Sequence, residues 1–240
     1  MKQRLDLVLV ARGLAESREK AQALIMAGSV TVAGQKAAKP GQTVDADAGI
    51  EVAAPPRYVS RGGLKLEAAL RHFGVDPSGL VCLDVGASTG GFTDCLLQRG
   101  ARRVHAIDVG TNQLDWRIRC DPRVRSQENL NARELTASHL DEPVDLLVCD
   151  VSFISVTLIL PAIVPLLAAN GRMIILVKPQ FEVGKGMVGK GGIVRDPALH
   201  DQACTRLRDA VAARGFETEL MPSPILGTEG NREFLLYAHH

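Results

Sequence analysis

The feature that most constrains the fold is a short run, residues 81–92, in which an apolar segment ends near an acid and breaks into glycines. It reads Val-Cys-Leu-Asp-Val-Gly-Ala-Ser-Thr-Gly-Gly-Phe. Glycines after an apolar strand allow a tight turn into a helix, with backbone amides close to a ligand. The spacing is not the dinucleotide fingerprint, because no Gly-x-Gly occurs in it. The run therefore predicts a strand, turn and helix, either as a nucleotide site or as an ordinary unit of an α/β protein.

Predicted strands and helices alternate through the rest of the chain. Further strands are expected at residues 103–108, 124–127, 144–150, 173–178, 217–221 and 232–237, and helices at 64–74, 92–99, 113–118, 154–167 and 199–214. This alternation predicts an α/β fold with a parallel, doubly wound sheet. Asp84, Asp108, Asp150 and Lys178 lie at strand ends, so we expect them at the carboxyl edge, where open α/β sheets bind ligands.

Three of the charged residues have an expected role or environment. Asp108 lies where nucleotide-binding α/β proteins present an acid to ribose hydroxyls; a carboxylate that caps a turn is the alternative, and the glycine turn favours the ribose role. Lys178 closes an apolar strand, so its ammonium must be hydrated or paired, and Asp150 is the expected partner. Lys65 lies in the first turn of a helix, where the helix dipole disfavours a cation, so the local sequence favours a solvated side chain.

The first part of the chain is expected to form a separate small domain. Two short helices are stopped by Gly13 and Gly28, Ser17 can cap the second, and strands are expected at residues 29–32 and 50–52. The sequence Ala-Ala-Pro-Pro, residues 53–56, is a stiff spacer that interrupts strands. We therefore expect a domain at residues 1–54, a linker at 55–61 and a second domain at 62–240.

The small domain carries a local excess of positive charge. Between Lys2 and Lys39 there are seven cations and three acids, although the formal net charge of the whole chain is only +1. A basic helical face can follow a phosphate backbone, and a solvated face is the alternative. The segments Gly-Leu-Ala-Glu-Ser-Arg-Glu-Lys-Ala and Gly-Ser-Val-Thr-Val-Ala-Gly resemble the S4-like RNA-binding domain, named after ribosomal small-subunit protein four, which usually has Asn where Ala33 stands. The resemblance implies RNA contacts from Arg4, Arg18, Lys20 and Lys36.

Composition indicates a globular protein of the cytoplasm. The five cysteines are an odd number without a Cys-x-x-Cys pair, which is typical of reduced, buried thiols. The first residues lack the apolar core of a signal peptide, and the longest apolar stretch, residues 152–169, is interrupted by two prolines. We expect neither export nor a membrane span. We also expect no metal site.

The glycine run also resembles the first motif of class I methyltransferases that use S-adenosylmethionine. That resemblance implies a Rossmann-like fold in which Asp108 binds the ribose of the cofactor, Asn129 lies near the adenine and Asp150 near the methionine moiety. The FtsJ class of ribose methyltransferases has a Lys-Asp-Lys-Glu tetrad, and Lys65, Asp150, Lys178 and Glu233 match it in order. The implied cofactor-binding residues are Asp84, Gly86, Ala87, Ser88, Thr89, Gly90, Gly91, Phe92, Asp108, Val109, Gln113, Asn129 and Asp150.

Several motifs together resemble the TlyA family, also called hemolysin A. They are residues 59–66 (Val-Ser-Arg-Gly-Gly-Leu-Lys-Leu), 84–92, 149–155 (Cys-Asp-Val-Ser-Phe-Ile-Ser) and 178–182 (Lys-Pro-Gln-Phe-Glu), beside the RNA-binding segment. The resemblance covers essentially the whole chain. It implies transfer of a methyl group from S-adenosylmethionine to the 2′-oxygen of cytidines in ribosomal RNA, 16S, 23S or both.

The implied partners are ribosomal RNA and ribosomal subunits. No membrane and no obligate protein partner are inferred, and the oligomeric state is left open. The alternative function is a noncatalytic RNA-binding or ribosome-assembly factor. Membrane lysis, which the hemolysin name suggests, is a remote alternative, because no long apolar helix and no strongly amphipathic cationic helix is predicted.

A glycine-rich segment, residues 184–191, fits the spacing of a phosphate-binding loop, Gly-x-x-x-x-Gly-Lys. Gly191 stands where such a loop has the Ser or Thr that binds magnesium, and no helix is predicted directly after it. We therefore expect a mobile, basic lid over the RNA site, with Lys185, Lys190 and Arg195 near phosphates. Arg61 is a further expected RNA contact.

Methyl transfer to a ribose hydroxyl requires an aligned oxygen and removal of its proton. Lys178 is the candidate base, and Lys65 and Glu233 are expected to orient the ribose and Lys178. The four groups would titrate as a coupled set, so the sequence leaves open which protonation state reacts.

Overall fold

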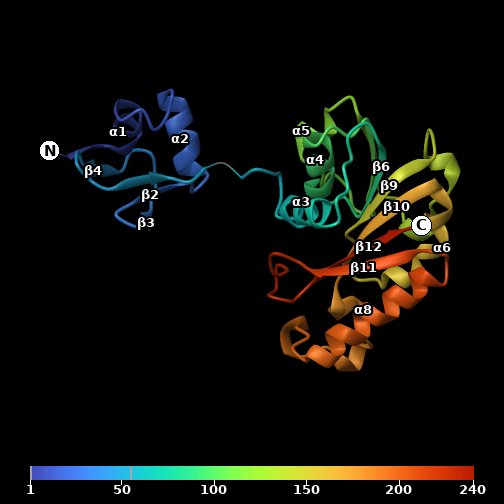
Figure 1. Ribbon diagram of the computed structural model, residues 1–240. Coiled ribbons are helices and arrows are strands. Elements are labelled where there is room, and N and C mark those ends of the chain that lie inside the picture. Colours follow the sequence, from blue (N-terminus) through green and yellow to red (C-terminus); the bar gives the residue numbers. More distant parts are fainter. Residues whose placement is uncertain (1, 55) are drawn as a thin grey trace. The chain divides into compact units, whose positions relative to one another are not determined.

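The computed structural model describes residues 2–54 and 56–240, and the chain divides between Arg57 and Tyr58 into two compact units (Figure 1). Pro55, part of the predicted linker, lies outside the described residues. The second unit contains the tetrad and the glycine turn, and each unit is described by itself.

The first unit has the two expected helices and five short strands. Its elements are β1 (Lys2–Arg4), α1 (Leu5–Ala11), α2 (Arg18–Met26), β2 (Val30–Val32), β3 (Gln35–Lys36), β4 (Thr43–Asp45) and β5 (Ile50–Val52). β1 pairs with β4, and a second sheet has the order β3-β2-β5. The helices pack on a small core that includes Leu5, Leu9 and Ile25. β1, β3 and β4 were not predicted: β1 and β3 contain no apolar residue and β4 contains one, whereas the predicted strands β2 and β5 contain two each.

Turns in this unit follow local chemistry. The Ser17 side chain accepts a hydrogen bond from the Lys20 amide, so the predicted cap of α2 is confirmed. Gly13 and Gly28 have φ of +69° and +70° just beyond the two helices, which confirms the predicted stops. Ala33 has φ +50° in the β2–β3 turn, a left-handed conformation that Asn adopts more readily than Ala.

The second unit is a seven-stranded sheet covered on both faces. Its strands are β6 (Val81–Val85), β7 (Arg103–Ile107), β8 (Val124–Gln127), β9 (Val144–Cys149), β10 (Leu167–Val177), β11 (Glu217–Pro222) and β12 (Phe234–His239). They pair in the order β11-β12-β10-β9-β6-β7-β8. Its α-helices are α3 (Gly62–His72), α4 (Gly91–Gln98), α5 (Trp116–Arg119), α6 (Leu160–Ile163), α7 (Pro179–Glu182) and α8 (Pro197–Ala212).

The sheet is mostly parallel. β10, β9, β6, β7 and β8 pair in parallel, joined by connections that carry helices or 3-10 turns. β12 is antiparallel to both of its neighbours, because it follows β11 after a loop without an intervening helix. The α/β prediction is confirmed, and the expectation of a parallel sheet fails at this one strand.

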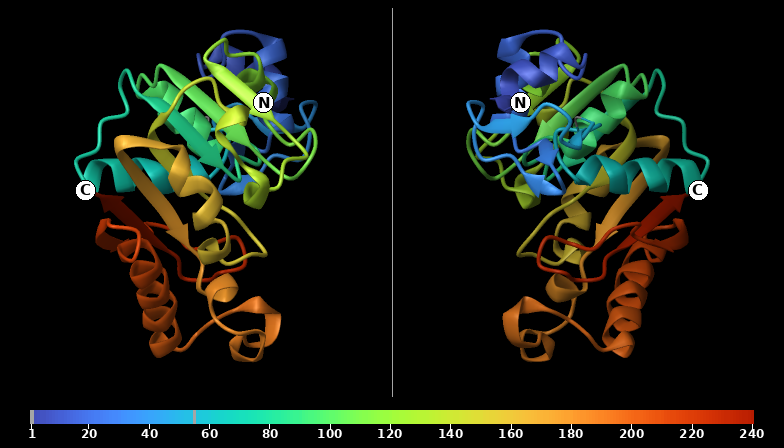
Figure 2. Two further views of the ribbon diagram at one scale, coloured as in Figure 1. Left: turned by 90° about the vertical axis from the view of Figure 1, so that its right-hand side faces the viewer. Right: turned by 90° about the vertical axis from the view of Figure 1, so that its left-hand side faces the viewer.

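Helices lie on both faces of the sheet, as the ribbons in Figure 2 show, and apolar side chains fill the layer on each face. Side chains of α3, α4 and α5 pack on one face, including Leu66, Leu96 and Ile118. Side chains of α6 and α8 pack on the other, including Leu160 and Leu207. The parallel strands are buried on both faces, so their carboxyl ends are the part of the sheet left open to a ligand.

The helix predicted at residues 154–167 is wrong as a continuous element. The chain instead forms a 3-10 turn (Val156–Leu158), the short helix α6 and another 3-10 turn (Val164–Leu166). Pro161 and Pro165 lack the amide hydrogen that a helix interior requires, which accounts for the interruptions. β10 begins at Leu167, six residues before the predicted strand, with a register shift between Leu167 and Arg172.

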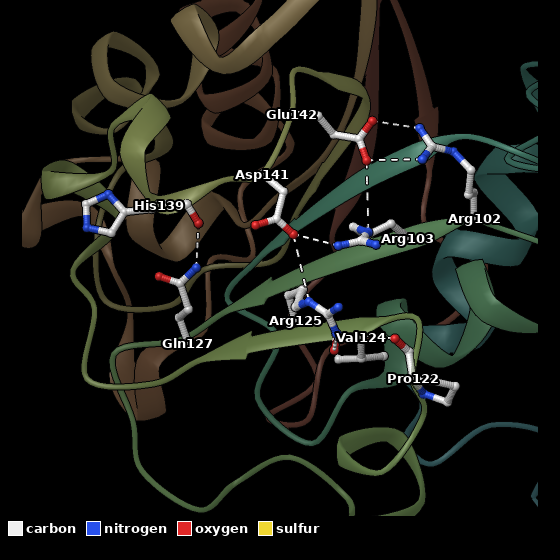
Figure 3. Close-up of polar contacts among 9 residues, drawn as sticks. All are labelled: Arg102, Arg103, Pro122, Val124, Arg125, Gln127, His139, Asp141 and Glu142. Carbon is white, nitrogen blue, oxygen red and sulfur yellow. Dashed lines mark hydrogen bonds and ion pairs between the residues drawn. The ribbon is translucent and has the colours of Figure 1, made fainter.

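An ion-pair network lies at the amino-terminal edge of the sheet, opposite the expected site (Figure 3). Arg102 donates to both carboxylate oxygens of Glu142 at 3.1 and 2.7 Å, and Arg103 donates to Asp141 at 2.5 Å. At the other end of β8, the side chain of its last residue, Gln127, donates to the carbonyl of His139 at 2.5 Å. The ion pairs of Arg102 and Arg103 hold the end of the β8–β9 connection that precedes β9. The other end of that connection contributes to a cavity at the carboxyl edge.

Four of the five cysteines are buried, and Cys120 is exposed. Burial raises the pKa of Cys82 to about 12 and the pKa of Cys95 and Cys204 to about 11. The prediction of buried thiols is therefore wrong for Cys120. Among the described residues, none of the helices is long and apolar enough to cross a membrane.

Candidate functional site

The glycine turn between β6 and α4 brings backbone close to the end of β9. Gly86 and Gly90 have φ of +85° and +97°, and a Cβ on Gly86 would lie 2.6 Å from the carbonyl oxygen of Asp150. Only glycine fits this conformation and this close approach without strain. The turn and Asp150 are therefore held against each other.

A cavity of about 410 Å³ lies on one side of this turn, and we call it the Asp108 cavity. The Asp108 carboxylate accepts hydrogen bonds from the amides of Ser88 at 2.8 Å and Gly110 at 2.7 Å. The carboxylate thus caps a turn and also lines the cavity, so the two interpretations of Asp108 are compatible. Six predicted cofactor residues line this cavity: Gly86, Ser88, Asp108, Val109, Gln113 and Asp150.

The four tetrad residues line a second cavity of about 460 Å³, the tetrad cavity. They form two ion pairs there. Lys178 Nζ lies 2.6 Å from Asp150 Oδ1, which confirms the predicted pairing, and Lys65 Nζ lies 2.5 Å from Glu233 Oε2. The Lys65–Glu233 pair is nearly buried, with 10% and 4% of the side chains exposed. Predicted cofactor residues Ala87, Thr89, Gly91 and Phe92 line this cavity, as does Arg61.

The two cavities share walls and adjoin a third. Gly86, Ser88, Asp150 and Ser152 line both the Asp108 cavity and the tetrad cavity. A third cavity of about 470 Å³, the Phe153 cavity, shares Ser152, Lys178, Thr228 and Glu233 with the tetrad cavity. The arrangement can hold one ligand against Asp108 and a second beside Phe153, with the tetrad between them.

The burial of Lys65 corrects the expectation that its side chain is solvated. Lys65 lies in the first turn of α3 and is 8% exposed. Its partner Glu233 comes from 168 residues further along the chain. A local argument from the helix dipole is wrong here because a buried carboxylate from the segment before β12 neutralises the ammonium.

Three predicted cofactor residues line none of these cavities. Asp84 is fully buried in β6, Gly90 packs against Leu114, and the Asn129 side chain accepts a hydrogen bond from the Thr111 hydroxyl at 2.7 Å. Their contact with a cofactor stays a prediction. Cavity residues that the sequence interpretation missed are Leu130, Asn131, Arg133, Ser152, Phe153, Gln180, Phe181, Thr228 and Asn231. Ser152 and Phe153 could have been flagged, since they lie two and three residues after Asp150, just beyond a strand end.

Asp84 predicts a pH dependence of stability. Burial raises its pKa to about 7, the charges of Asp150 and Asp108 add to the rise, and the Thr93 hydroxyl, donating at 2.6 Å, opposes it. In the unfolded chain an Asp side chain has a pKa of about 4. Between about pH 4 and 7 the folded state therefore binds more protons than the unfolded state, so the free energy of unfolding falls as pH rises through this window.

We expect Asp84→Asn to remove this contribution, so that the difference in Tm between pH 5 and pH 8 becomes smaller than in the wild type. Thermal unfolding followed by circular dichroism at both pH values measures it. Asp209→Asn, an exposed acid on α8, is the matched control and should retain the wild-type difference. An unchanged pH dependence in Asp84→Asn would contradict the assignment.

The predicted RNA contacts of the first unit include two arginines that share one buried acid. Asp6 is fully buried and accepts hydrogen bonds from Arg4, Arg18 and Gln22. The Arg4 hydrogen bond, with those of Gln22 and Arg18, holds the pKa of Asp6 well below its usual range, against the opposing effect of burial. Arg4 and Arg18 stay about half exposed, so Asp6 fixes their position while leaving them accessible.

The remaining predicted RNA contacts are more scattered. Lys20 pairs with Glu16, and Lys36 is exposed on β3. Arg61 donates to the carbonyl of Leu226 at 2.5 Å, which ties the start of α3 to the loop before β12. Lys190 is exposed, and the side chain of Lys185 lies outside the described residues.

The glycine-rich segment does not form a phosphate-binding loop. It contains two 3-10 turns (Lys185–Met187 and Lys190–Gly192), and the next helix, α8, begins only at Pro197. The Asn231 side chain holds the segment, donating to the Gly192 carbonyl and accepting from the Val194 amide, both at 2.9 Å. Val188, Gly191 and Gly192 line the Phe153 cavity, while the mobility of a lid stays a prediction.

Comparisons with known proteins agree with this arrangement. Residues 58–240 match the FtsJ-like methyltransferase family, and residues 3–50 match the S4 domain. The chain is 45% identical to the 16S/23S rRNA (cytidine-2′-O)-methyltransferase TlyA of Mycobacterium tuberculosis, over 98% of this chain and 88% of that protein. It is 44% identical to Hemolysin A of Brachyspira hyodysenteriae, over 98% of each chain.

A solved structure from Streptococcus thermophilus, described as a hemolysin, superposes with a TM-score of 0.76. It is 43% identical, over 99% of this chain and 88% of that one. The two family matches together, the sequence identity to these relatives and the structural similarity each cover nearly the whole chain. The chain therefore belongs to the FtsJ-like methyltransferase family, in the group of TlyA proteins that carry an additional S4 domain.

Proposed function

We propose that the protein transfers a methyl group from S-adenosylmethionine to the 2′-oxygen of cytidines in ribosomal RNA. The observation that carries the proposal is the convergence of Lys65, Asp150, Lys178 and Glu233 on one cavity that shares a wall with the Asp108 cavity. A cofactor site and a site for a hydroxyl nucleophile are thus adjacent. The 45% identity to an rRNA (cytidine-2′-O)-methyltransferase supports the substrate class.

The Asp108 cavity has the chemistry that the cofactor requires. Asp108 supplies acceptors for ribose hydroxyls, the apolar side chains Ile107, Leu130 and Ile159 suit an adenine ring, and Gly86 lets the backbone approach closely. The bound cofactor supplies an electrophilic methyl group on a sulfonium. Asp150 lies in the shared wall, where its carboxylate suits the positive charge of that region.

The tetrad then serves the nucleophile. Lys178 in its neutral form accepts the proton of the 2′-hydroxyl while the oxygen attacks the methyl group. The 2′-oxygen loses a proton and gains the methyl group, the bond between the sulfonium sulfur and the methyl carbon breaks to leave a neutral thioether, and the proton stays on the Lys178 nitrogen. Lys65 and Glu233, held as a nearly buried pair, orient the ribose.

RNA is held by basic and aromatic side chains. Arg4, Arg18, Lys20 and Lys36 of the S4 domain contact phosphates, as do Arg61 and Lys190 of the methyltransferase domain. Phe153 is 91% exposed, and its ring centroid lies 5.2 Å from that of Phe181. An exposed aromatic ring beside the tetrad is suited to stacking on an unpaired base. Because ribosomal subunits are the proposed substrates, we infer that the protein acts in the cytoplasm.

The test is transfer of labelled methyl from S-adenosylmethionine to purified small and large ribosomal subunits that lack the modification. We expect incorporation into RNA that maps to a cytidine and protects its 3′ phosphodiester bond from alkaline cleavage, since that cleavage needs a free 2′-hydroxyl. Binding to the subunits without incorporation would contradict the proposal and favour a noncatalytic RNA-binding or assembly factor.

A further inference from the structure

Ser152 lies where the three cavities meet. It is the third residue after β9, is exposed, and lines the Asp108, tetrad and Phe153 cavities. Its Oγ accepts a hydrogen bond from Lys178 Nζ at 2.8 Å. Within the described residues, Lys178 is the one side chain bonded to this hydroxyl. No helix cap or turn bond of the described chain accounts for a serine at this point.

The Lys178 nitrogen donates a hydrogen bond to Ser152 Oγ at 2.8 Å and lies 2.6 Å from Asp150 Oδ1, an ion pair in which that oxygen accepts no hydrogen bond. A neutral amine has two N–H groups and one lone pair. With one N–H fixed on Ser152 Oγ, the nearby Asp150 carboxylate favours the second N–H over the lone pair on its side, which leaves the lone pair for the proton of the ribose hydroxyl. Without the Ser152 hydroxyl, the amine would have no hydrogen-bond acceptor within the described residues, so it would rotate about the Cε–Nζ bond and direct its lone pair variably.

The loop that carries Ser152 is itself fastened to the segment that carries Lys178. Glu182, buried at the end of α7, accepts hydrogen bonds from the Ser155 hydroxyl at 2.5 Å and the Val156 amide at 2.8 Å. α7 begins directly after Lys178. The two segments are thus joined at both ends of the loop, by Lys178 with Ser152 and by Glu182 with Ser155 and Val156. This limits the drift of the serine relative to the amine.

We propose that Ser152 is a positioning residue for methyl transfer, whose hydroxyl orients the neutral amine of Lys178 toward the ribose 2′-oxygen. The inference rests on the proposed function and adds one positioning residue beside the four residues of the tetrad. When the 2′-O–H bond breaks, the amine becomes an ammonium whose third N–H carries the transferred proton. The ion pair with Asp150 and the hydrogen bond to Ser152 persist through the step, so the site needs no rearrangement of this nitrogen.

The experiment compares the wild type with Ser152→Ala and Ser152→Thr in the full-length protein. We expect Ser152→Ala to lower kcat about tenfold, with KM for S-adenosylmethionine and the Tm unchanged, because the amine keeps its ion pair and loses only its orientation. Ser152→Thr retains a hydroxyl and should recover most of kcat. A purely structural role would instead lower Tm, or raise KM without the recovery by threonine.

Ser126→Ala is the matched control, since Ser126 is an exposed serine on β8, a strand that lines none of the three cavities. It should retain the wild-type kcat. A Ser152→Ala variant as fast as the wild type, or a Ser152→Thr variant as slow as Ser152→Ala, would overturn the role of the hydroxyl while leaving the proposed function intact. A wild-type protein that transfers no methyl to ribose would overturn the proposed function and this inference with it.

Discussion

Lys178→Ala is expected to lower methyl transfer to ribosomal RNA by at least about a hundredfold, the contribution typical of a positioned general base. Binding of S-adenosylmethionine should stay within about twofold of the wild type. The reason is that Lys178 lines the tetrad and Phe153 cavities but not the Asp108 cavity. Asp150 loses its partner, but its side chain is 22% exposed, so its charge stays partly hydrated and the fold is retained. Labelled-methyl incorporation and calorimetric titration of the cofactor measure the two quantities.

Lys178→Arg distinguishes proton removal from charge. An arginine can keep an ion pair with Asp150, but its guanidinium remains protonated at any accessible pH and cannot serve as a base. We expect this variant to be as slow as Lys178→Ala while binding the cofactor and RNA normally. Methyl transfer near the wild-type rate in Lys178→Arg would show that the positive charge is the contribution of this side chain, and that another group takes the proton.

Gly86→Ala is expected to weaken cofactor binding at least about tenfold and to slow methyl transfer in proportion. An alanine at φ +85° is strained by about 1–2 kcal/mol, and its Cβ would lie 2.6 Å from the Asp150 carbonyl oxygen. The contacted oxygen belongs to the backbone and a Cβ cannot rotate away, so the backbone at one of the two residues must move. The displacement reaches Asp150, which lies in the wall shared by the Asp108 and tetrad cavities. Cofactor titration and thermal unfolding check both consequences.

Gly79→Ala tests the effect of backbone strain alone, without the close contact that a Cβ at position 86 would make with Asp150. Gly79 has a similar φ, +75°, in the turn before β6, and a Cβ there would meet nothing within 4 Å. This control should lose a similar amount of stability to strain, yet bind the cofactor as the wild type does. Equal cofactor affinity in the two variants would contradict the view that the contact between Gly86 and Asp150 shapes the site.

Local chemistry made much of this fold predictable. The apolar run before Gly86 predicted β6 and the glycine turn, and Ser17, Gly13 and Gly28 marked helix ends correctly, because caps and left-handed turns depend on a few neighbouring residues. The alternation of strands and helices predicted the α/β sheet. The apolar pattern of residues 154–167 predicts one helix, but Pro161 and Pro165 divide this stretch into three short elements.

The sequence by itself determined the inventory of the site: an acid or a lysine after each of three parallel strands, a glycine turn, and Lys65 and Glu233 far apart in the chain. Only the tertiary structure decided that these residues form two ion pairs, that Lys65 is buried rather than solvated, and that Ser152 lies within hydrogen-bond reach of Lys178. The physical reason is distance along the chain. Periodicity and capping act over a few residues, whereas the partner of Lys65 lies 168 residues away and meets it only when β12 adds antiparallel to the sheet.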